Sequence, residues 1–75
     1  MSQSLPAVTG REVLKVLAGI GFIQVSTRGS HVKVAHPDGR VTVVPMHGGR
    51  DIPRGTLGSI LRQAGLTVAE FRKLL

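Results

Sequence analysis

Near the beginning of the chain, apolar residues recur every three to four positions, which is the spacing of one helical face. Thr9 and Glu12 precede this run in the order of a capping box, in which each side chain bonds to the other residue's backbone. Gly21 then supplies a helix stop. The pattern predicts a helix over about residues 10–20, whose apolar face consists of Val13, Leu14, Leu17 and Ile20.

Over residues 23–28, and again over residues 31–36, apolar and polar residues alternate, which is typical of half-buried β-strands. Gly29 and Ser30 lie between the two runs. A two-residue type II′ turn requires glycine at its first position, where φ is positive. The two runs are therefore predicted to form a hairpin.

The length of this turn determines which side chains share a face of the sheet. With two residues in the turn, Arg28 lies opposite His31, and Lys33 follows on the same face. This face is polar or small throughout, whereas the other face is mostly apolar. We expect the polar face to be open to solvent and the apolar face to pack on helices. The predicted pairs are Arg28–His31, Ser26–Lys33 and Gln24–Ala35 on the open face, and Thr27–Val32 and Val25–Val34 on the packed face.

A third strand is predicted over residues 41–44, after a three-residue loop that ends in Gly39. A loop of this length brings Pro45, at the end of the strand, opposite His31. His47 then lies diagonally across from His31, about 7–8 Å away by sheet geometry. Two histidines from separate segments are therefore expected on one face.

Residues 46–52 are predicted to form a flexible loop, and Pro53 suits the first turn of the helix that follows. Apolar residues recur at helical spacing in that helix, and Gly65 ends it. Thr67 and Glu70 form a second capping box, which opens a short terminal helix. The helical stripe consists of Leu57, Ile60, Leu61 and Ala64, and the terminal helix adds Phe71, Leu74 and Leu75.

These elements predict an α+β fold in the order α-β-β-β-α-α, with a three-stranded antiparallel sheet and helices packed on one face. Seventy-five residues allow one domain. We expect a flexible N-terminal lead-in over residues 1–8 and a single domain over residues 9–75. No apolar run approaches the ~20 residues that span a bilayer, no signal peptide is evident, and there is no cysteine. A cytoplasmic protein without disulfides or thiolate metal sites is expected.

The charge balance is strongly basic, with ten Lys and Arg against four Asp and Glu and a formal net charge of +6. Nucleic acid is the favoured partner, because surplus cationic side chains contribute most to binding when they neutralise phosphates and release the counterions. An acidic protein partner and a merely solubilising charge are the alternatives. Phe22 and Phe71 are the only aromatic residues. This scarcity argues against RNA-binding modules that stack bases on aromatic side chains.

His31 is the principal catalytic candidate, because an imidazole titrates at about pH 6.5 and can accept or donate a proton. RNA offers a suitable reaction, in which the 2′-hydroxyl attacks the adjacent phosphate. Arg28 and Lys33 on the same face can neutralise phosphate, although an exposed histidine beside a turn is more often inert. His47 is the second candidate, as a partner acid or base or as a histidine that caps the strand end. His36, at the other end of its strand, is expected to be structural.

The beginning of the second predicted helix is a further candidate phosphate site, since free backbone amides, the Arg54 guanidinium and the Thr56 hydroxyl converge there. Gly48 and Gly49, followed by Arg50, lack the P-loop pattern and are more typical of a flexible connector. No metal site is expected, because only two histidines converge and no third ligand is evident.

Several short motifs occur in a specific order between Gly10 and Leu75. They are Gly21-Phe22, Gly29-Ser30-His31, Val44-Pro45-Met46-His47, Ile52-Pro53-Arg54-Gly55-Thr56-Leu57, Ile60-Leu61 and Ala64-Gly65-Leu66-Thr67. This set resembles the HicA-type mRNA interferase toxins, the YcfA/HicA-like family of bacterial type II toxin–antitoxin systems.

The resemblance implies a fold like that of double-stranded-RNA-binding domains and cleavage of mRNA without a metal or cofactor, with the histidine of the Gly-Ser-His motif as the catalytic residue. It also implies a HicB-type antitoxin that covers this histidine and represses the operon through its own DNA-binding domain. The alternatives are a non-catalytic double-stranded-RNA-binding module and a basic interaction domain for an acidic partner. The expected site consists of His31 and His47 as catalytic residues, and of Arg28, Gly29, Ser30, Lys33, Arg54 and Thr56 as substrate-binding residues.

Overall fold

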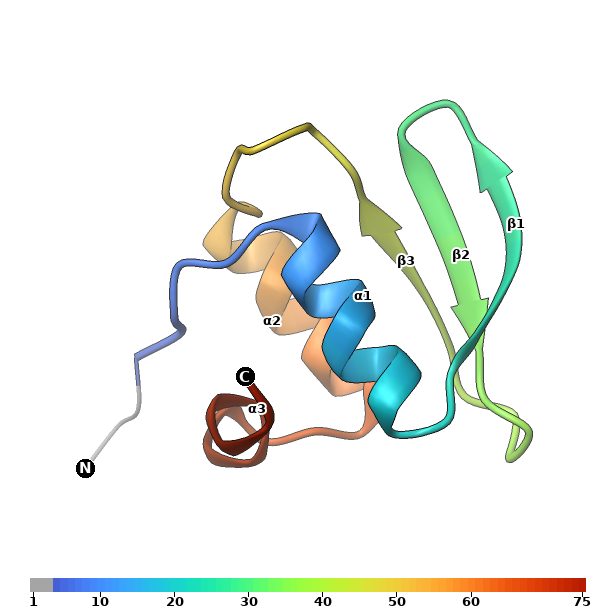
Figure 1. Cartoon of the computed structure of the whole chain (residues 1–75). Helices are drawn as coiled ribbons and strands as arrows, with labels where there is room; N and C mark the ends of the chain where they lie inside the picture. The colour runs from blue at the N-terminus through green and yellow to red at the C-terminus, as the bar shows by residue number, and fades with distance from the viewer. Residues whose placement is uncertain (1–3) are drawn as a thin grey trace.

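The computed structural model describes residues 4–75 of the chain. It forms one antiparallel sheet in the strand order β1-β2-β3, and Figure 1 shows the helices gathered on one side of this sheet. The predicted α+β architecture, of the type found in double-stranded-RNA-binding domains, is confirmed. The elements are α1 (Gly10–Gly19), β1 (Ile23–Arg28), β2 (His31–Ala35), β3 (Val41–Pro45), α2 (Arg54–Ala64) and α3 (Val68–Leu74).

Helix α1 begins at the predicted capping box. The Thr9 hydroxyl accepts the backbone N–H of Glu12, and the Glu12 carboxylate accepts the backbone N–H of Thr9 at 2.9 Å. The helix ends before Gly21, which has a φ of 103°. The buried face differs from the predicted one: Val16 is buried, whereas Leu14 and Ile20 are only partly buried. The helix is therefore rotated slightly about its axis relative to the prediction.

The hairpin of β1 and β2 has the predicted register where it meets the turn. Arg28 pairs with His31, and Ser26 pairs with Lys33. Gly29 has a φ of 58° while Ser30 does not have a positive φ, which agrees with a type II′ turn. The pairing of β2 with β3 also agrees with the prediction, since Pro45 lies opposite His31.

Two predictions about β1 are wrong. A bulge at Val25 shifts the register, so that Gln24 pairs with Val34 instead of Ala35, and Val25 has no partner there. All six residues of β1 are exposed, so the strand is not half-buried. Both helices that contact the sheet lie mainly against β3, which leaves β1 as an uncovered edge. Ile23 and Val25 are consequently 60% and 53% exposed.

The core lies between the sheet and the helices, and it extends into the segment before α1. Val8 is only 2% exposed, and its carbonyl accepts the N–H of Ile52 at 2.8 Å. This part of the predicted lead-in is thus packed against the domain, while residues 1–3 lie outside the described residues. The buried apolar residues are Val8, Val13, Val16, Leu17, Phe22, Val32, Val34, Val44, Ile52, Leu57, Ile60, Leu61, Ala64 and Phe71.

The helical elements at the carboxyl end largely agree with the prediction. Pro53 is the N-cap of α2 and lies just before the first turn of the helix, whereas the sequence predicted it within that turn. Gly65, with a φ of 73°, caps the other end, and α3 begins at the predicted capping box of Thr67 and Glu70. Among residues 4–75, no helix is long and apolar enough to cross a membrane.

Candidate nucleic-acid site

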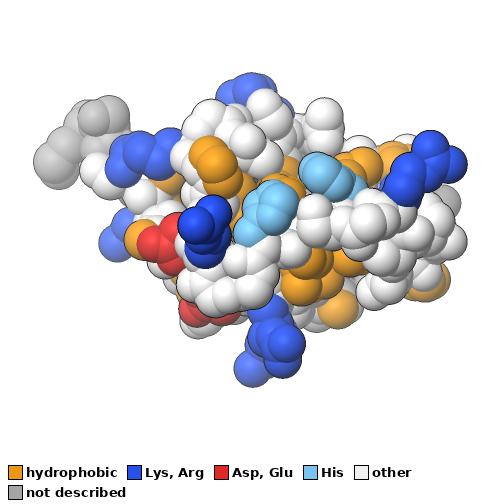
Figure 2. Space-filling model, turned by 90° about the horizontal axis from the view of Figure 1, so that it is seen from above, with side chains coloured by type: hydrophobic (Ala, Val, Ile, Leu, Met, Phe, Trp, Pro, Cys, Tyr) orange, Lys and Arg blue, Asp and Glu red, His pale blue; other side chains and the backbone are white. Residues whose placement is uncertain are grey.

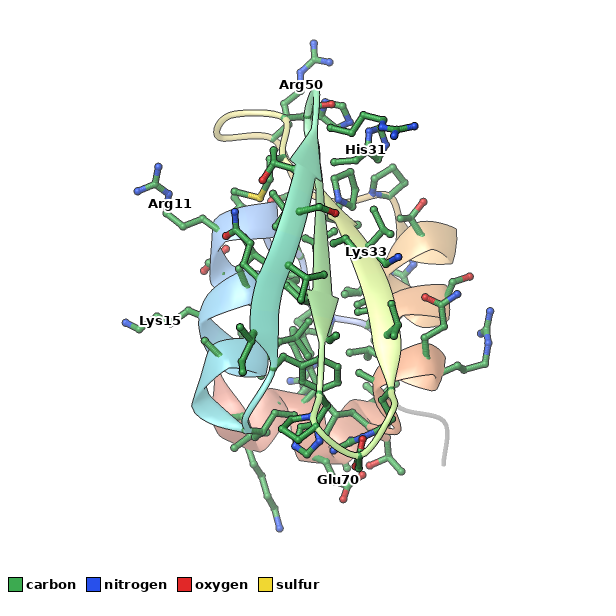
Figure 3. The ribbon with its side chains drawn as sticks, turned by 90° about the vertical axis from the view of Figure 1, so that its right-hand side faces the viewer. Arg11, Lys15, His31, Lys33, Arg50 and Glu70 are labelled. Atoms are coloured by element: carbon green, nitrogen blue, oxygen red, sulfur yellow. The ribbon has the colours of Figure 1, made fainter. Side chains whose placement is uncertain are left out.

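His31 is the first residue of β2, directly after the Gly29-Ser30 turn. Inward-facing residues of β2 such as Val32 are buried, whereas His31 and Lys33 are exposed on the open face of the sheet. Figure 3 shows His31 and Lys33 along this face. Arg28 is the cross-strand partner of His31, so the register brings two cationic side chains to the same face as the imidazole.

His47 lies beside His31, as the sequence predicted. The two ring centroids are 6.2 Å apart, and the rings meet edge to face at 88°. Two pairings hold this geometry: Pro45 lies opposite His31 in the sheet, and the N–H of Met46 donates to the carbonyl of Ser30. Both histidines are exposed, and Figure 2 shows histidine side chains next to each other at this end of the molecule.

His36 is structural, as expected. Its Nε2 donates to the carbonyl of Ile20 at 3.1 Å, and its Nδ1 accepts the N–H of Asp38. Its ring also meets the edge of Phe22, with centroids 5.3 Å apart. A side chain at Gly21 would lie 2.8 Å from this imidazole, so His36 occupies the space that the glycine leaves. These contacts join the β2–β3 loop to the end of α1.

The ion pairs of the described residues lie away from the two exposed histidines. Asp38 pairs with Arg40 in the β2–β3 loop, where the His36 ring also lies beside it, and the hydrogen bond from Arg40 lowers the pKa of Asp38 below its usual range. Within residues 4–75, Arg28 and Lys33 form no ion pair. Both cations are therefore available to a negatively charged ligand.

Helix α2 differs from its neighbours at its beginning. Pro53 offers no side-chain cap, and the first turn contains no acidic residue, whereas α1 and α3 each carry a capping box with a glutamate. Arg54, Gly55 and Thr56 are exposed there. Figure 1 shows α2 beginning at the end of the molecule where β3 stops. Uncapped backbone amides at this position can bind an anion.

One contact that holds the site together was not predicted. A Cβ at Gly10 would lie 2.7 Å from the Sδ of Met46 and against the carbonyl oxygen of Pro45. Only glycine allows α1 to approach the end of β3 this closely. The signal in the sequence was a glycine in the first turn of a capped helix, where a good helix former is usually preferred.

The arrangement can move protons and bind phosphate. Two adjacent imidazoles can serve as acid and base, and the cations beside them can neutralise an anionic substrate. Among residues 4–75, no group of three or more His, Asp or Glu side chains converges as a metal site would require.

A comparison with protein-family models matches residues 10–66 of the 75-residue chain to the model described as "HicA toxin of bacterial toxin-antitoxin". The match spans α1, the whole sheet and α2, and it includes both exposed histidines. No curated protein matches the chain.

Proposed function

Because the chain belongs to the HicA toxin family and is thus the toxin component of a bacterial toxin–antitoxin system, we propose that it is an endoribonuclease that cleaves mRNA. The observation that carries the proposal is the edge-to-face pair of His31 and His47 on the open face of the sheet. Acid–base cleavage of RNA needs two such groups, and an imidazole suits both roles near neutral pH.

In the proposed reaction, one imidazole accepts the proton of a ribose 2′-hydroxyl, and the 2′-oxygen attacks the adjacent phosphorus. The bond from phosphorus to the 5′-oxygen breaks, and the other imidazole, in its protonated form, donates a proton to that oxygen. The products are a 2′,3′-cyclic phosphate and a free 5′-hydroxyl. His31 is the main catalytic residue and His47 its partner, and the steps need no metal or cofactor.

The substrate would be held by the polar groups around the two imidazoles. Arg28 and Lys33 share the face of His31 and are free of ion pairs among the described residues. Gly29 and Ser30 form the turn that directly precedes His31, and in the proposal their backbone contacts the substrate. A further phosphate would be bound at the uncapped beginning of α2, by Arg54 and Thr56.

The family also implies an antitoxin partner. We propose that this partner is of the HicB type and covers His31, so that the toxin is inactive in the complex. Because the substrate is mRNA, the proposal places the protein in the cytoplasm.

The test is cleavage of single-stranded RNA by the purified protein in the presence of EDTA. We expect cleavage by the unmodified protein and a loss of about 10²–10⁴-fold in kcat for His31→Ala. Lys73→Ala is the matched control, because Lys73 is an exposed cation in the last turn of α3, away from the exposed histidines. Equal cleavage by His31→Ala and Lys73→Ala would refute the assignment. Tight binding of double-stranded RNA without any cleavage would favour a non-catalytic module.

A further inference from the structure

An open groove of about 560 Å³ lies between the beginning of α1 and the segment that follows β3, and Met46 and Gly48, the chain neighbours of His47, line it. The chain leaves β3 at Met46 and returns to the beginning of α1, where Asp51 forms a β-bridge with Thr9. The segment between them therefore passes beside the first turn of α1 and borders the groove. Its lining residues are Thr9, Arg11, Met46, Gly48 and Gly49.

The beginning of α1, which borders the groove, packs closely against the end of β3. Gly10 packs against Met46 and Pro45 without room for a Cβ, so the beginning of α1 cannot move independently of the end of β3. Met46 is also bonded through its N–H to Ser30, in the turn that precedes His31. The backbone at Arg11 is thereby connected, through Gly10 and Met46, to the turn that precedes His31.

Arg11 gives the groove an unpaired positive charge. Within residues 4–75, its guanidinium makes no ion pair and no side-chain hydrogen bond. The neighbouring Glu12 is engaged by the backbone N–H of Thr9, and it lines a separate hollow beside α3. None of the residues that line the groove is acidic. Figure 3 shows Arg11 and Arg50 at the same end of the molecule as His31.

Gly49 leaves the groove open without any conformational reason to be glycine. Gly48, its neighbour, has a φ of 61° and is required by the turn. Gly49 does not have a positive φ, and a Cβ placed on it would meet nothing within 4 Å. A side chain at this position would therefore fit the backbone at the lining of the groove.

We propose that this groove is an RNA subsite, which holds the nucleotides on one side of the scissile phosphate and binds a backbone phosphate through Arg11. The proposal rests on the function proposed above. Met46 and Gly48, which flank His47 in the chain, both line the groove, and in the proposal the RNA passes along this segment from the histidine pair into the groove. A guanidinium forms two parallel hydrogen bonds to a phosphate, which suits this role.

The first test compares Arg11→Ala with Lys15→Ala, a cation one helical turn further along α1 that does not line the groove. Each variant is assayed on an RNA dinucleotide and on a longer single-stranded RNA. We expect Arg11→Ala to raise KM for the longer RNA about tenfold, with kcat unchanged, because a charge-assisted phosphate contact is lost. Neither variant should change cleavage of the dinucleotide, which is too short to reach the groove.

The second test adds a large side chain to the lining of the groove. Gly49→Leu should raise KM for the longer RNA in the same way, whereas Gly19→Leu should not. Gly19 is the matched control, because a Cβ there also meets nothing within 4 Å, and it lies at the opposite end of α1.

The outcomes separate the subsite from the catalytic proposal. If the unmodified protein cleaves the longer RNA but Arg11→Ala behaves like Lys15→Ala, the subsite is refuted and the ribonuclease stands. If the unmodified protein cleaves neither RNA, the proposed function fails, and the affinities of the same variants for the longer RNA then decide the subsite. A loss of antitoxin affinity in Arg11→Ala without any change toward RNA assigns the groove to protein binding and overturns the proposal.

Discussion

The imidazoles of His31 and His47 lie 6.2 Å apart, edge to face, although one belongs to the beginning of β2 and the other to the loop after β3. The pairing of His31 with Pro45 produces this relationship, because it ends β3 directly beside the Gly-Ser turn. The two rings are exposed, so their proximity contributes little to the core. It is instead suited to a reaction that needs an acid and a base.

His47→Ala should reduce kcat for RNA cleavage by about 10²–10⁴-fold, because one of the two proton-transfer groups is removed. The double variant with His31→Ala should be hardly slower than the slower single variant, since groups that act as a unit are not additive. Single-turnover kinetics on one RNA measures both effects. An unchanged kcat in His47→Ala would show that His47 transfers no proton in the reaction and only lies next to His31.

Arg28→Ser and Lys33→Ser should weaken RNA binding by a similar amount for different RNA sequences, because both residues are proposed to contact phosphate. Each loss should make the slope of log K against log salt concentration shallower by about 0.7. A salt titration with an RNA that carries 2′-deoxyribose at the cleavage site measures binding without cleavage. Lys73→Ala in α3 should retain the slope of the unmodified protein, and a retained slope in Arg28→Ser would argue against a phosphate contact.

His36→Ala should lower stability and leave catalysis intact. It removes the hydrogen bond to the carbonyl of Ile20 and the edge contact with Phe22, which together should cost about 1–2 kcal/mol. Urea denaturation measures the loss, and kcat is compared under conditions where both proteins are folded. A large fall in kcat with unchanged stability would place His36 in the site after all.

Glu70→Gln should destabilise the protein at neutral pH but not in acid. Hydrogen bonds from Thr67, first from its backbone N–H, lower the pKa of Glu70 below its ordinary value of 4.5. A carboxyl whose pKa is lowered by folding stabilises the folded state at any pH above the pKa that it has in the unfolded chain. This contribution is lost as the pH falls through the lower pKa of the folded state. Glutamine retains the shape of the cap, so the urea midpoints of the two proteins should converge in acid. A constant difference at every pH would exclude the charge as its cause.

Phe71→Ala should destabilise the protein by about 3–5 kcal/mol, because Phe71 is fully buried and the cavity cannot close completely. This is a large part of the stability of a domain of this size. Thermal unfolding followed by circular dichroism measures the loss. Leu74→Ala, at an exposed position of the same helix, is the control and should change the midpoint little.

Much of the fold could be predicted from local sequence, because its signals act over a few residues. Each capping box, at Thr9 and at Thr67, forms between residues three positions apart. The positive φ of Gly29 depends only on the two-residue turn in which it lies. The lengths of the two hairpin turns then determine the register of the three strands, and this register places His47 beside His31.

The errors concern features that no local pattern signals. Alternation along residues 23–28 indicated a half-buried strand, but burial depends on whether a helix covers the strand, and the helices lie mainly against β3. The bulge at Val25 has no turn residue to signal it, so the pairing of Gln24 was wrong. Alternation of apolar and polar residues indicates which side chains share a face of a strand. It does not indicate whether a helix packs against that face.

By itself, the sequence determined the order of the elements, their caps and turns, and the pair of histidines on one face, since these follow from backbone conformations that nearest neighbours set. Only the tertiary structure decided that β1 is an uncovered edge, that Val8 belongs to the core, and that Arg11 lines one groove with Met46 and Gly48, the chain neighbours of His47. The packing of Gly10 against Met46 produces that last arrangement. Such a contact depends on the close approach of two segments, and no local pattern specifies it.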